Sequence, residues 1–238
     1  MKVIKIILYL FIILSFITAL FINVSPQFGS NPSRSQKQFF SSFNNFKNGE
    51  FKNNEPTALF TDQMSFLDFF KTELNRVPIK EIIPLNVDVQ SFVKDNIEQI
   101  KMVWLGHSAF LININGTVIL LDPMLGSHAA PVPLPSLKRY SSKIAFDINE
   151  LEVIDVVVFS HDHYDHLDYP TVKKIKSRVK NFIVPHGIGN HLKSWGVQSK
   201  SIIELNWDES FNYNGIEFVC LPARHFSGRG PLNRNSTL

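Results

Sequence analysis

Hydrophobic and polar positions divide the chain into three stretches, residues 1–24, 25–98 and 99–238. The first contains nineteen uncharged, mostly apolar residues, 6–24, after Lys2 and Lys5. As a helix it is about 28 Å long, close to the thickness of the hydrocarbon core of a bilayer. It is apolar on every face, which is typical of a helix in lipid rather than one in a soluble core. We therefore expect an N-terminal hydrophobic helix that acts as a transmembrane anchor.

The charges around this helix predict its orientation. Basic residues before an apolar helix favour an inside N-terminus with the rest of the chain translocated. We expect a membrane-anchored protein with its main domain on the extracytoplasmic side. A cleaved signal peptide is the alternative and makes the protein secreted or periplasmic. The apolar stretch is long for a signal peptide and lacks a clean small-x-small cleavage site, which favours the anchor.

The second stretch, 25–98, is predicted to be a connector with some helix. Up to Pro56 it is rich in Ser, Asn, Gln, Lys and Phe, which indicates an exposed segment with scattered aromatic contacts. Within 65–80 the apolar residues recur at helical spacing and predict an amphipathic helix; they are Phe66, Phe69, Phe70 and Leu74.

The third stretch begins with a strand-like pattern. Strands are predicted over 103–114 and 117–121, joined at Asn115 and Gly116, a pair that favours a two-residue hairpin turn. The loop that follows contains Pro131, Pro133 and Pro135 and is not regular structure. Two interpretations of this loop stay open, a flap that lines or gates a groove and a rigid surface connector.

Strands and helices alternate from there. Asp168 is placed to cap a helix with Pro170 in its first turn. A second helix is predicted to end near Gly196. Val172, Ile175 and Val179 form the apolar face of the first helix, and the second runs through His191 and Leu192. Strands are predicted over 153–160, 182–184, 201–205 and 215–221. This alternation predicts an α/β layered domain.

Composition excludes several functions. The 238 residues are 44% hydrophobic and 19% charged, with a net charge of +3, which suits one globular domain with appendages. The basic residues form no stripe with interleaved aromatics, so no nucleic-acid partner is expected. No Gly-rich phosphate loop and no Gly-x-Ser-x-Gly elbow occur. A single cysteine, Cys220, excludes an internal disulfide and lies in an apolar run that favours packing over nucleophilic chemistry.

Metal-binding residue types are concentrated in residues 161–166, His-Asp-His-Tyr-Asp-His, directly after the buried strand 153–160. His161 and His163 are two residues apart, so in an extended segment they point the same way and can hold one ion. Asp165 and His166 follow where the chain turns and can face a second ion. Two ions about 3.5–4 Å apart can share a hydroxide and stabilise both oxygens of a displacement.

This run resembles the metal-binding motif of the metallo-β-lactamase superfamily, and further segments narrow the resemblance. Residues 104–112 (WLGHSAFLI), 121–123 (LDP) and 222–230 (PARHFSGRG) are similar to motifs of its N-acyl-phosphatidylethanolamine-hydrolysing phospholipase D branch. The resemblance covers about residues 99–238. It implies an αββα sandwich with two Zn²⁺ ions at one edge of two sheets.

The resemblance also implies roles for single residues. His225 joins His161 and His163 on the first ion, with an open fourth position as in catalytic zinc sites. Asp165 and His166 begin the second site, and Asp122 supports the metal-binding loop without binding metal.

Other polar residues have two open interpretations each. His107 can contact substrate or merely pack, and Arg229 can pair with a phosphate or be a surface charge. Asp168 is favoured as a helix cap over a ligand. His186 can line the pocket or be an ordinary hydrogen-bonded loop residue, and His128 and His191 are weaker candidates.

The motif set has a gap. The resembled site needs a bridging aspartate and a final histidine after the third histidine, yet nothing acidic follows Glu217 and no histidine follows His225. Asn233 also stands where an aspartate is common in the branch. We expect a C-terminally truncated domain that exposes an unpaired sheet edge and an apolar face, with the second metal site incomplete and the fragment itself inactive.

These observations predict a zinc-dependent hydrolase in which a hydroxide bound to two zinc ions attacks a phosphodiester. The substrate expected is a small molecule or a phospholipid, such as an N-acyl phospholipid cleaved in the manner of a phospholipase D. Other hydrolases of the fold, a lactonase or a nuclease, are the enzymatic alternatives. A non-catalytic, membrane-tethered metal-binding protein is the alternative of another class.

Overall fold

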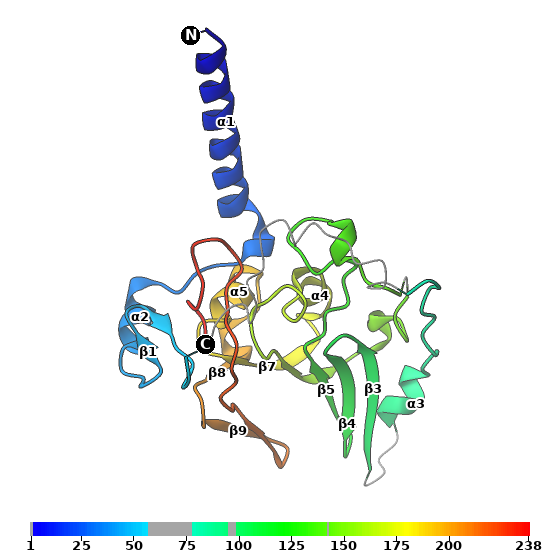
Figure 1. Cartoon of the computed structure of the whole chain (residues 1–238). Helices are drawn as coiled ribbons and strands as arrows, with labels where there is room; N and C mark the ends of the chain where they lie inside the picture. The colour runs from blue at the N-terminus through cyan, green and yellow to red at the C-terminus, as the bar shows by residue number, and fades with distance from the viewer. Residues whose placement is uncertain (1, 57–77, 95–98, 142) are drawn as a thin grey trace.

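A six-stranded mixed sheet lies at the centre of the computed structural model, which describes residues 2–56, 78–94, 99–141 and 143–238 (Figure 1). The sheet order follows the chain order, β3-β4-β5-β6-β7-β8. Strands β3, β4 and β5 pair antiparallel. Strands β6, β7 and β8 each pair in parallel with the strand before them. Their bounds are β3 Ile100–Gly106, β4 Ala109–Ile114, β5 Thr117–Leu121, β6 Ile154–Val158, β7 Val179–Pro185 and β8 Ile202–Leu205.

Two tight turns build the antiparallel half. Asn115 and Gly116 both have positive φ and join β4 to β5 with Ile114 opposite Thr117, which confirms the predicted hairpin. The single strand predicted over 103–114 is wrong. Gly106 (φ 98°) and His107 (φ 47°) turn the chain and divide it into β3 and β4, because a left-handed pair cannot continue an extended strand.

Short helices cover one face of the sheet and bury its larger core. They are α3 Val89–Lys94, α4 Tyr169–Ile175 and α5 Gly189–Ser194. The predicted cap of α4 is confirmed, because the Asp168 side chain accepts a hydrogen bond from the Thr171 backbone. The helix is shorter than predicted: Val179 begins β7 and is not on the helix face. Gly196 (φ 85°) follows α5, as its predicted end requires.

The other face of the sheet is only partly covered. The antiparallel hairpin of β9 (Ser210–Tyr213) and β10 (Ile216–Val219) packs against part of it. On the edge strand β3, alternate apolar side chains remain exposed: Ile100 is 72%, Met102 63% and Trp104 63% accessible. Among the described residues no strand pairs with the outer edge of β3, so within this part of the chain the predicted edge and apolar face are present.

The N-terminal region is packed against the domain except for its first helix. After α1 (Lys2–Val24) come η1 Pro26–Phe28, α2 Arg34–Phe40, β1 Phe46–Lys47 and β2 Glu50–Phe51. Phe40, Phe46 and Phe51 form a small aromatic core that also contacts Leu238. Short 3-10 turns complete the fold at Pro135–Leu137, Ile148–Glu150 and Ser199–Ser201. The helix predicted over 65–80 falls mostly outside the described residues.

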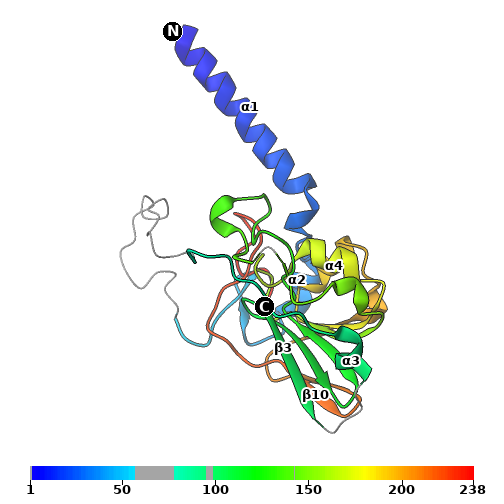
Figure 2. The same cartoon turned by 90° about the vertical axis from the view of Figure 1, so that its right-hand side faces the viewer.

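Helix α1 projects away from the domain in both views (Figures 1 and 2). None of its residues is buried, and its mean hydropathy reaches 2.6. Among the described residues it is the one helix long and apolar enough to cross a membrane. A signal sequence near the N-terminus has the same length and apolar composition.

Candidate metal centre

The loop after β6 carries the polar run 161–166 to the edge of the sheet where parallel strands end. The first four residues of strand β6 are buried and Val158 is partly buried, so the polar side chains that reach solvent come after the strand ends. Asp122 follows the neighbouring strand β5 and lies beside this loop, with its backbone N–H donating to the Val158 carbonyl (2.9 Å). The site is thus built where two adjacent strand ends meet.

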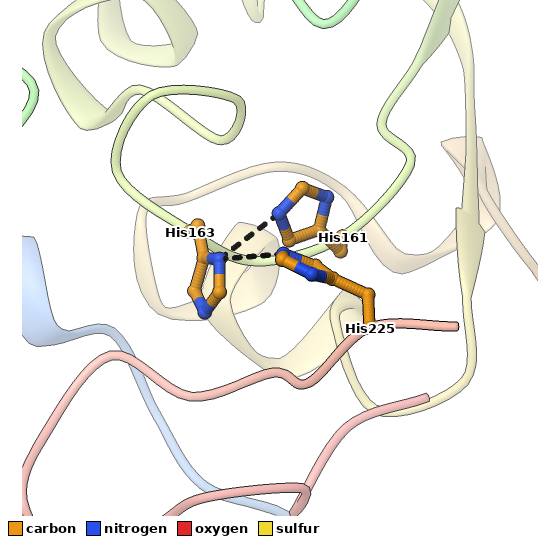
Figure 3. A group of neighbouring side chains, drawn as sticks. All are labelled: His161, His163 and His225. Atoms are coloured by element: carbon orange, nitrogen blue, oxygen red, sulfur yellow. Dashed lines mark hydrogen bonds between the residues drawn. The ribbon is translucent and has the colours of Figure 1, made fainter. Parts of the chain in front are cut away.

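Three imidazoles converge to form the first cluster, His161, His163 and His225 (Figure 3). Nδ1 of His163 lies 3.0 Å from Nε2 of His161 and 3.1 Å from Nε2 of His225. Zn–N bonds of about 2.0–2.1 Å in tetrahedral geometry place ligand nitrogens about 3.4 Å apart. The three nitrogens therefore fit a shared ion of this kind with small adjustments.

Electrostatics favours neutral imidazoles in this cluster. Burial and the neighbouring imidazoles lower the pKa of His161 to about 3. Burial also lowers the pKa of His163 and of His225. An imidazole binds metal only through an unprotonated nitrogen, so this environment keeps the donors in the form a cation needs.

A second cluster contains His107, Asp165 and His166. Oδ2 of Asp165 lies 3.0 Å from Nε2 of His107 and 3.7 Å from Nε2 of His166. Burial raises the pKa of Asp165, but the nearby imidazoles outweigh it and the net shift is downward. The group offers one carboxylate and two imidazoles, a donor set that suits Zn²⁺, Mn²⁺ or Fe. Spacing along the chain does not place His107 here; its left-handed backbone in the β3–β4 turn does.

Asp122 and Ser160 orient both clusters. Asp122 accepts hydrogen bonds from Nδ1 of His166 (2.8 Å) and from the backbone and hydroxyl of Ser160 (2.7 and 2.6 Å). The Ser160 hydroxyl also lies 3.0 Å from Nδ1 of His161. With Nδ1 held on each imidazole, Nε2 of His161 and of His166 points toward the other donors of its own cluster, where it can bind an ion. The sequence analysis assigns no role to Ser160, and its position as the last residue of the predicted strand 153–160, next to His161, is the signal that could have found it.

Arg229 lies in the interior and away from both clusters. Its side chain is 2% exposed and donates to the carbonyls of Asp162 (2.6 Å), Leu167 (2.8 Å) and Gln27 (2.9 Å). The guanidinium also lies over the ring of Tyr164. This burial contradicts the surface-charge interpretation, and the guanidinium donates to backbone carbonyls around the metal-binding loop, which leaves it no contact with a phosphate in this arrangement.

The fully buried Asp162 completes this interior network. It accepts from Gly228 N–H (2.7 Å) and the Thr237 hydroxyl (3.0 Å), and lies 3.4 Å from Nε2 of His191. Burial raises its pKa, but His191 and the other partners outweigh it and shift the pKa well below the usual range. Asp162 is therefore ionised and structural, and this first carboxylate of the run points into the interior and away from the metal clusters.

Of the remaining candidates, His128 and His186 lie apart from the clusters. His128 contacts Ser127 in the proline-rich loop, and His186 packs among Phe39, Phe40 and Phe43. Cys220 is half-buried, and burial raises the pKa of its thiol to about 11, which suits packing. It lines a cavity of about 330 Å³ beside the first cluster, together with His161, His225, Trp207, Leu221 and Phe226.

Comparison with known families fits this geometry. A model described as the beta-lactamase superfamily domain matches residues 117–238, half of the chain. The chain belongs to the beta-lactamase superfamily. The predicted family and α/β fold are therefore confirmed, and the first metal cluster lies within the matched residues.

The curated proteins that are similar to this chain include one uncharacterized protein and two that are named as hydrolases. The chain is 35% identical over 197 residues to an uncharacterized protein of Mycobacterium tuberculosis, covering 82% of this chain and 52% of that protein. It is 33% identical over 172 residues to N-acyl-phosphatidylethanolamine-hydrolyzing phospholipase D 1 of Caenorhabditis elegans, covering 67% and 48%. A UPF0173 metal-dependent hydrolase of Hyperthermus butylicus is 28% identical over 130 residues, covering 53% and 51%.

The chain spans about half the length of the curated relatives it matches. Among solved structures, the diiron β-hydroxylase CmlA of Streptomyces venezuelae aligns with a TM-score of 0.41 and 26% identity, covering 53% of this chain and 24% of that one.

Proposed function

We propose that the protein is a metal-dependent hydrolase that acts on a phosphodiester, with a lipid such as an N-acyl phospholipid as substrate. The observation that carries the proposal is the convergence of His161, His163 and His225, with His107, Asp165 and His166 beside them. Two clusters of unlike composition, side by side at one sheet edge, fit two metal positions better than one.

The chain's own residues have distinct tasks in this proposal. The three imidazoles of the first cluster hold one zinc ion, and Asp165 and His166 contribute to the second. Asp122 and Ser160 orient the imidazoles, and the interior network of Arg229 and Asp162 fixes the loop that carries them. When bound, such ions lower the pKa of a water molecule and stabilise negative charge that develops on the substrate.

The choice of substrate rests on similarity. A relative 33% identical to this chain is named for hydrolysis of N-acyl-phosphatidylethanolamine. We propose that α1 anchors the domain at a membrane, which would place such a lipid within reach.

Activity assays on the metal-loaded whole protein test the substrate. We expect phosphatidic acid to be released from N-acyl-phosphatidylethanolamine, with no turnover of a lactone or a β-lactam. Turnover of only the lactone, or of only a nucleic-acid phosphodiester, would overturn the phospholipase proposal and leave a metal-dependent hydrolase. Failure to bind zinc, measured by elemental analysis, would overturn the metal site as well.

A further inference from the structure

We propose that the loop 126–140 and the foot of α1, by which we mean its C-terminal end at Val24 and the following η1, form one lipid-facing surface. The domain rests on the bilayer through this surface. The contact would fix which side of the domain faces the bilayer. The proposal concerns a surface outside both metal clusters and does not depend on which substrate is cleaved.

The first step is that the end of α1 is held rigidly to the domain. Only Ser25 separates Val24, the last residue of α1, from η1. Pro26 accepts a hydrogen bond from the Trp195 indole (2.7 Å), and Gln27 accepts one from Arg229 (2.9 Å). Trp195 and Arg229 are 3% and 2% exposed, so both anchoring groups belong to the protein interior.

Phe28 and Ser30 make further contacts that hold this segment to the domain and to α1. Ser30 donates its N–H to Nδ1 of the fully buried His191 (3.0 Å). The Phe28 ring packs edge-on against Phe21 of α1 (5.7 Å) and against Tyr164 of the metal-binding loop (6.4 Å). The helix therefore cannot swing freely, and its exit point sets the orientation of the whole domain.

The second step is that the exit point defines a level in the bilayer. Helix α1 has 23 residues, none of them buried. At 1.5 Å per residue it spans about 34 Å, slightly more than the hydrocarbon core. If α1 crosses the membrane, the domain residues beside its foot lie among the lipid head groups.

The third step identifies those residues as the loop 126–140. Gln27 of η1 lines a cavity of about 200 Å³ together with Gly126, Ser127 and His128 of the loop. Figures 1 and 2 both show this green loop rising beside the foot of α1. The loop is thus held at the same level as the helix exit.

The chemistry of the loop suits lipid. Leu134, Leu137 and Tyr140 are 42%, 45% and 54% exposed around the turn Pro135–Leu137. The sequence from 124 to 146 contains no acidic residue, whereas Lys138 and Lys143 are basic. The third basic residue, Arg139, donates to backbone carbonyls of the protein and is not counted as a head-group contact. Exposed leucines with tyrosine and lysine are typical of segments at a membrane interface, and basic residues favour anionic head groups.

The other exposed apolar row supplies a matched control. Ile100 is 72% exposed and is the first residue of β3. Strand β3 lies away from α1 in both views. Ile100 and Leu137 both present an aliphatic side chain to solvent, so hydrophobicity alone does not distinguish the two positions. The proposal distinguishes them by their distance from the foot of α1.

The experiment uses the full chain in vesicles of phosphatidylcholine and phosphatidylglycerol at 3:1. In a Cys220→Ser background, Leu137→Cys and Ile100→Cys are each labelled with an environment-sensitive fluorophore. Lipids with a nitroxide near the head group then quench any probe at the bilayer surface. We expect emission at position 137 to fall by about half and emission at position 100 to change by less than a tenth.

Three outcomes would overturn the proposal. The first is equal quenching at both positions, which would indicate adsorption without orientation. The second is quenching at neither position in protein that floats with the vesicles, which would place the loop away from lipid. The third is protein that does not float with the vesicles, which would remove the anchor on which the level depends. Circular dichroism of both labelled variants checks that they are folded.

Discussion

At the scale of single residues, the site depends on keeping imidazoles neutral and correctly turned. His161, His163 and His225 are close enough to repel one another when protonated, and partial burial penalises the charge further. Ser160 and Asp122 hold the outer nitrogens of His161 and His166. The site is thus prepared for a cation before one binds, which reduces the reorganisation that binding requires.

Removing one imidazole tests the first metal position. His163 lies within about 3 Å of both His161 and His225. We therefore expect His163→Ala to weaken zinc binding by at least about 100-fold, because losing a residue that merely supports a metal ligand already costs up to about that much. Competition with a chromophoric chelator measures the affinity. His128→Ala is the control, because His128 lies outside both clusters, and equal affinity in the two variants would contradict the assignment.

His107 tests the second position separately. We expect His107→Ala to lower the affinity for the weaker-bound ion by about 10-fold or more, because the carboxylate of Asp165 loses a partner 3.0 Å away. The tighter-bound ion is expected to be unaffected. Co²⁺ titration followed by absorbance separates the two ions, and loss of the tight ion instead would assign His107 to the first position.

The lowered pKa of His161 predicts a pH dependence of stability in metal-free protein. The unfolded chain takes up a proton near pH 6.5, whereas the folded protein does so only near pH 3. Stability is therefore lost as pH falls from about 6.5 toward 3, by about 1–2 kcal/mol at pH 5 from this residue. Urea unfolding in EDTA at pH 7 and pH 5 measures it. His161→Gln should show a smaller loss, and an identical loss would exclude this residue as the source.

At the scale of elements, the metal-binding loop is held from beneath by a buried polar network. Arg229 joins the loop to η1 through carbonyls on both, and Asp162 joins it to the segment near the C-terminal end through Gly228 and Thr237. Buried charges of this kind are costly to leave unpaired. The network therefore makes three segments, far apart in sequence, depend on one another.

Truncating the buried arginine tests this dependence. Arg229→Ala is expected to lower the free energy of unfolding by about 3 kcal/mol, because it leaves the buried carbonyls of Asp162, Leu167 and Gln27 without their donor and removes a cation beside the Asp162 carboxylate. Lys52→Ala is the control: its ion pair with Glu50 is 45% exposed on each side and contributes less than about 1 kcal/mol. Urea unfolding at neutral pH compares them, and equal small losses would argue against a structural network.

At the scale of the whole molecule, the two faces of the sheet differ. Helices α3, α4 and α5 cover one face of the sheet, whereas among the described residues the β9–β10 hairpin covers only part of the other face. In the part of the chain that the structure describes, β3 is an edge strand and its uncovered row presents exposed apolar side chains, which favours association between molecules.

A charge on this row tests that expectation. Met102→Lys is expected to weaken self-association of the chain by about tenfold or more, because it places a charge on an edge strand. Sedimentation velocity over a range of concentrations measures it. Lys101→Glu, on the opposite face of the same strand, is the control, and an equal effect of both variants would point to net charge instead of the apolar row.

The sequence by itself determined the family, the alternation of strands and helices and the ligand-bearing run 161–166. These follow from local patterns, because strand periodicity, the Asn-Gly turn and closely spaced histidines need no knowledge of the rest of the fold. Even here the length of α4 and the division at His107 were misjudged, since Val179 pairs in the sheet and a left-handed turn leaves no hydrophobic signal.

Only the tertiary structure decided which polar residues meet. It placed His107 beside Asp165 and turned Arg229 inward, because both depend on chain segments about 60 residues away in sequence. It also set η1 against Trp195 and the loop 126–140, which gives the foot of α1 a defined place on the domain. Contacts between distant segments arise from packing and shared hydrogen bonds, and no local pattern of residues encodes them.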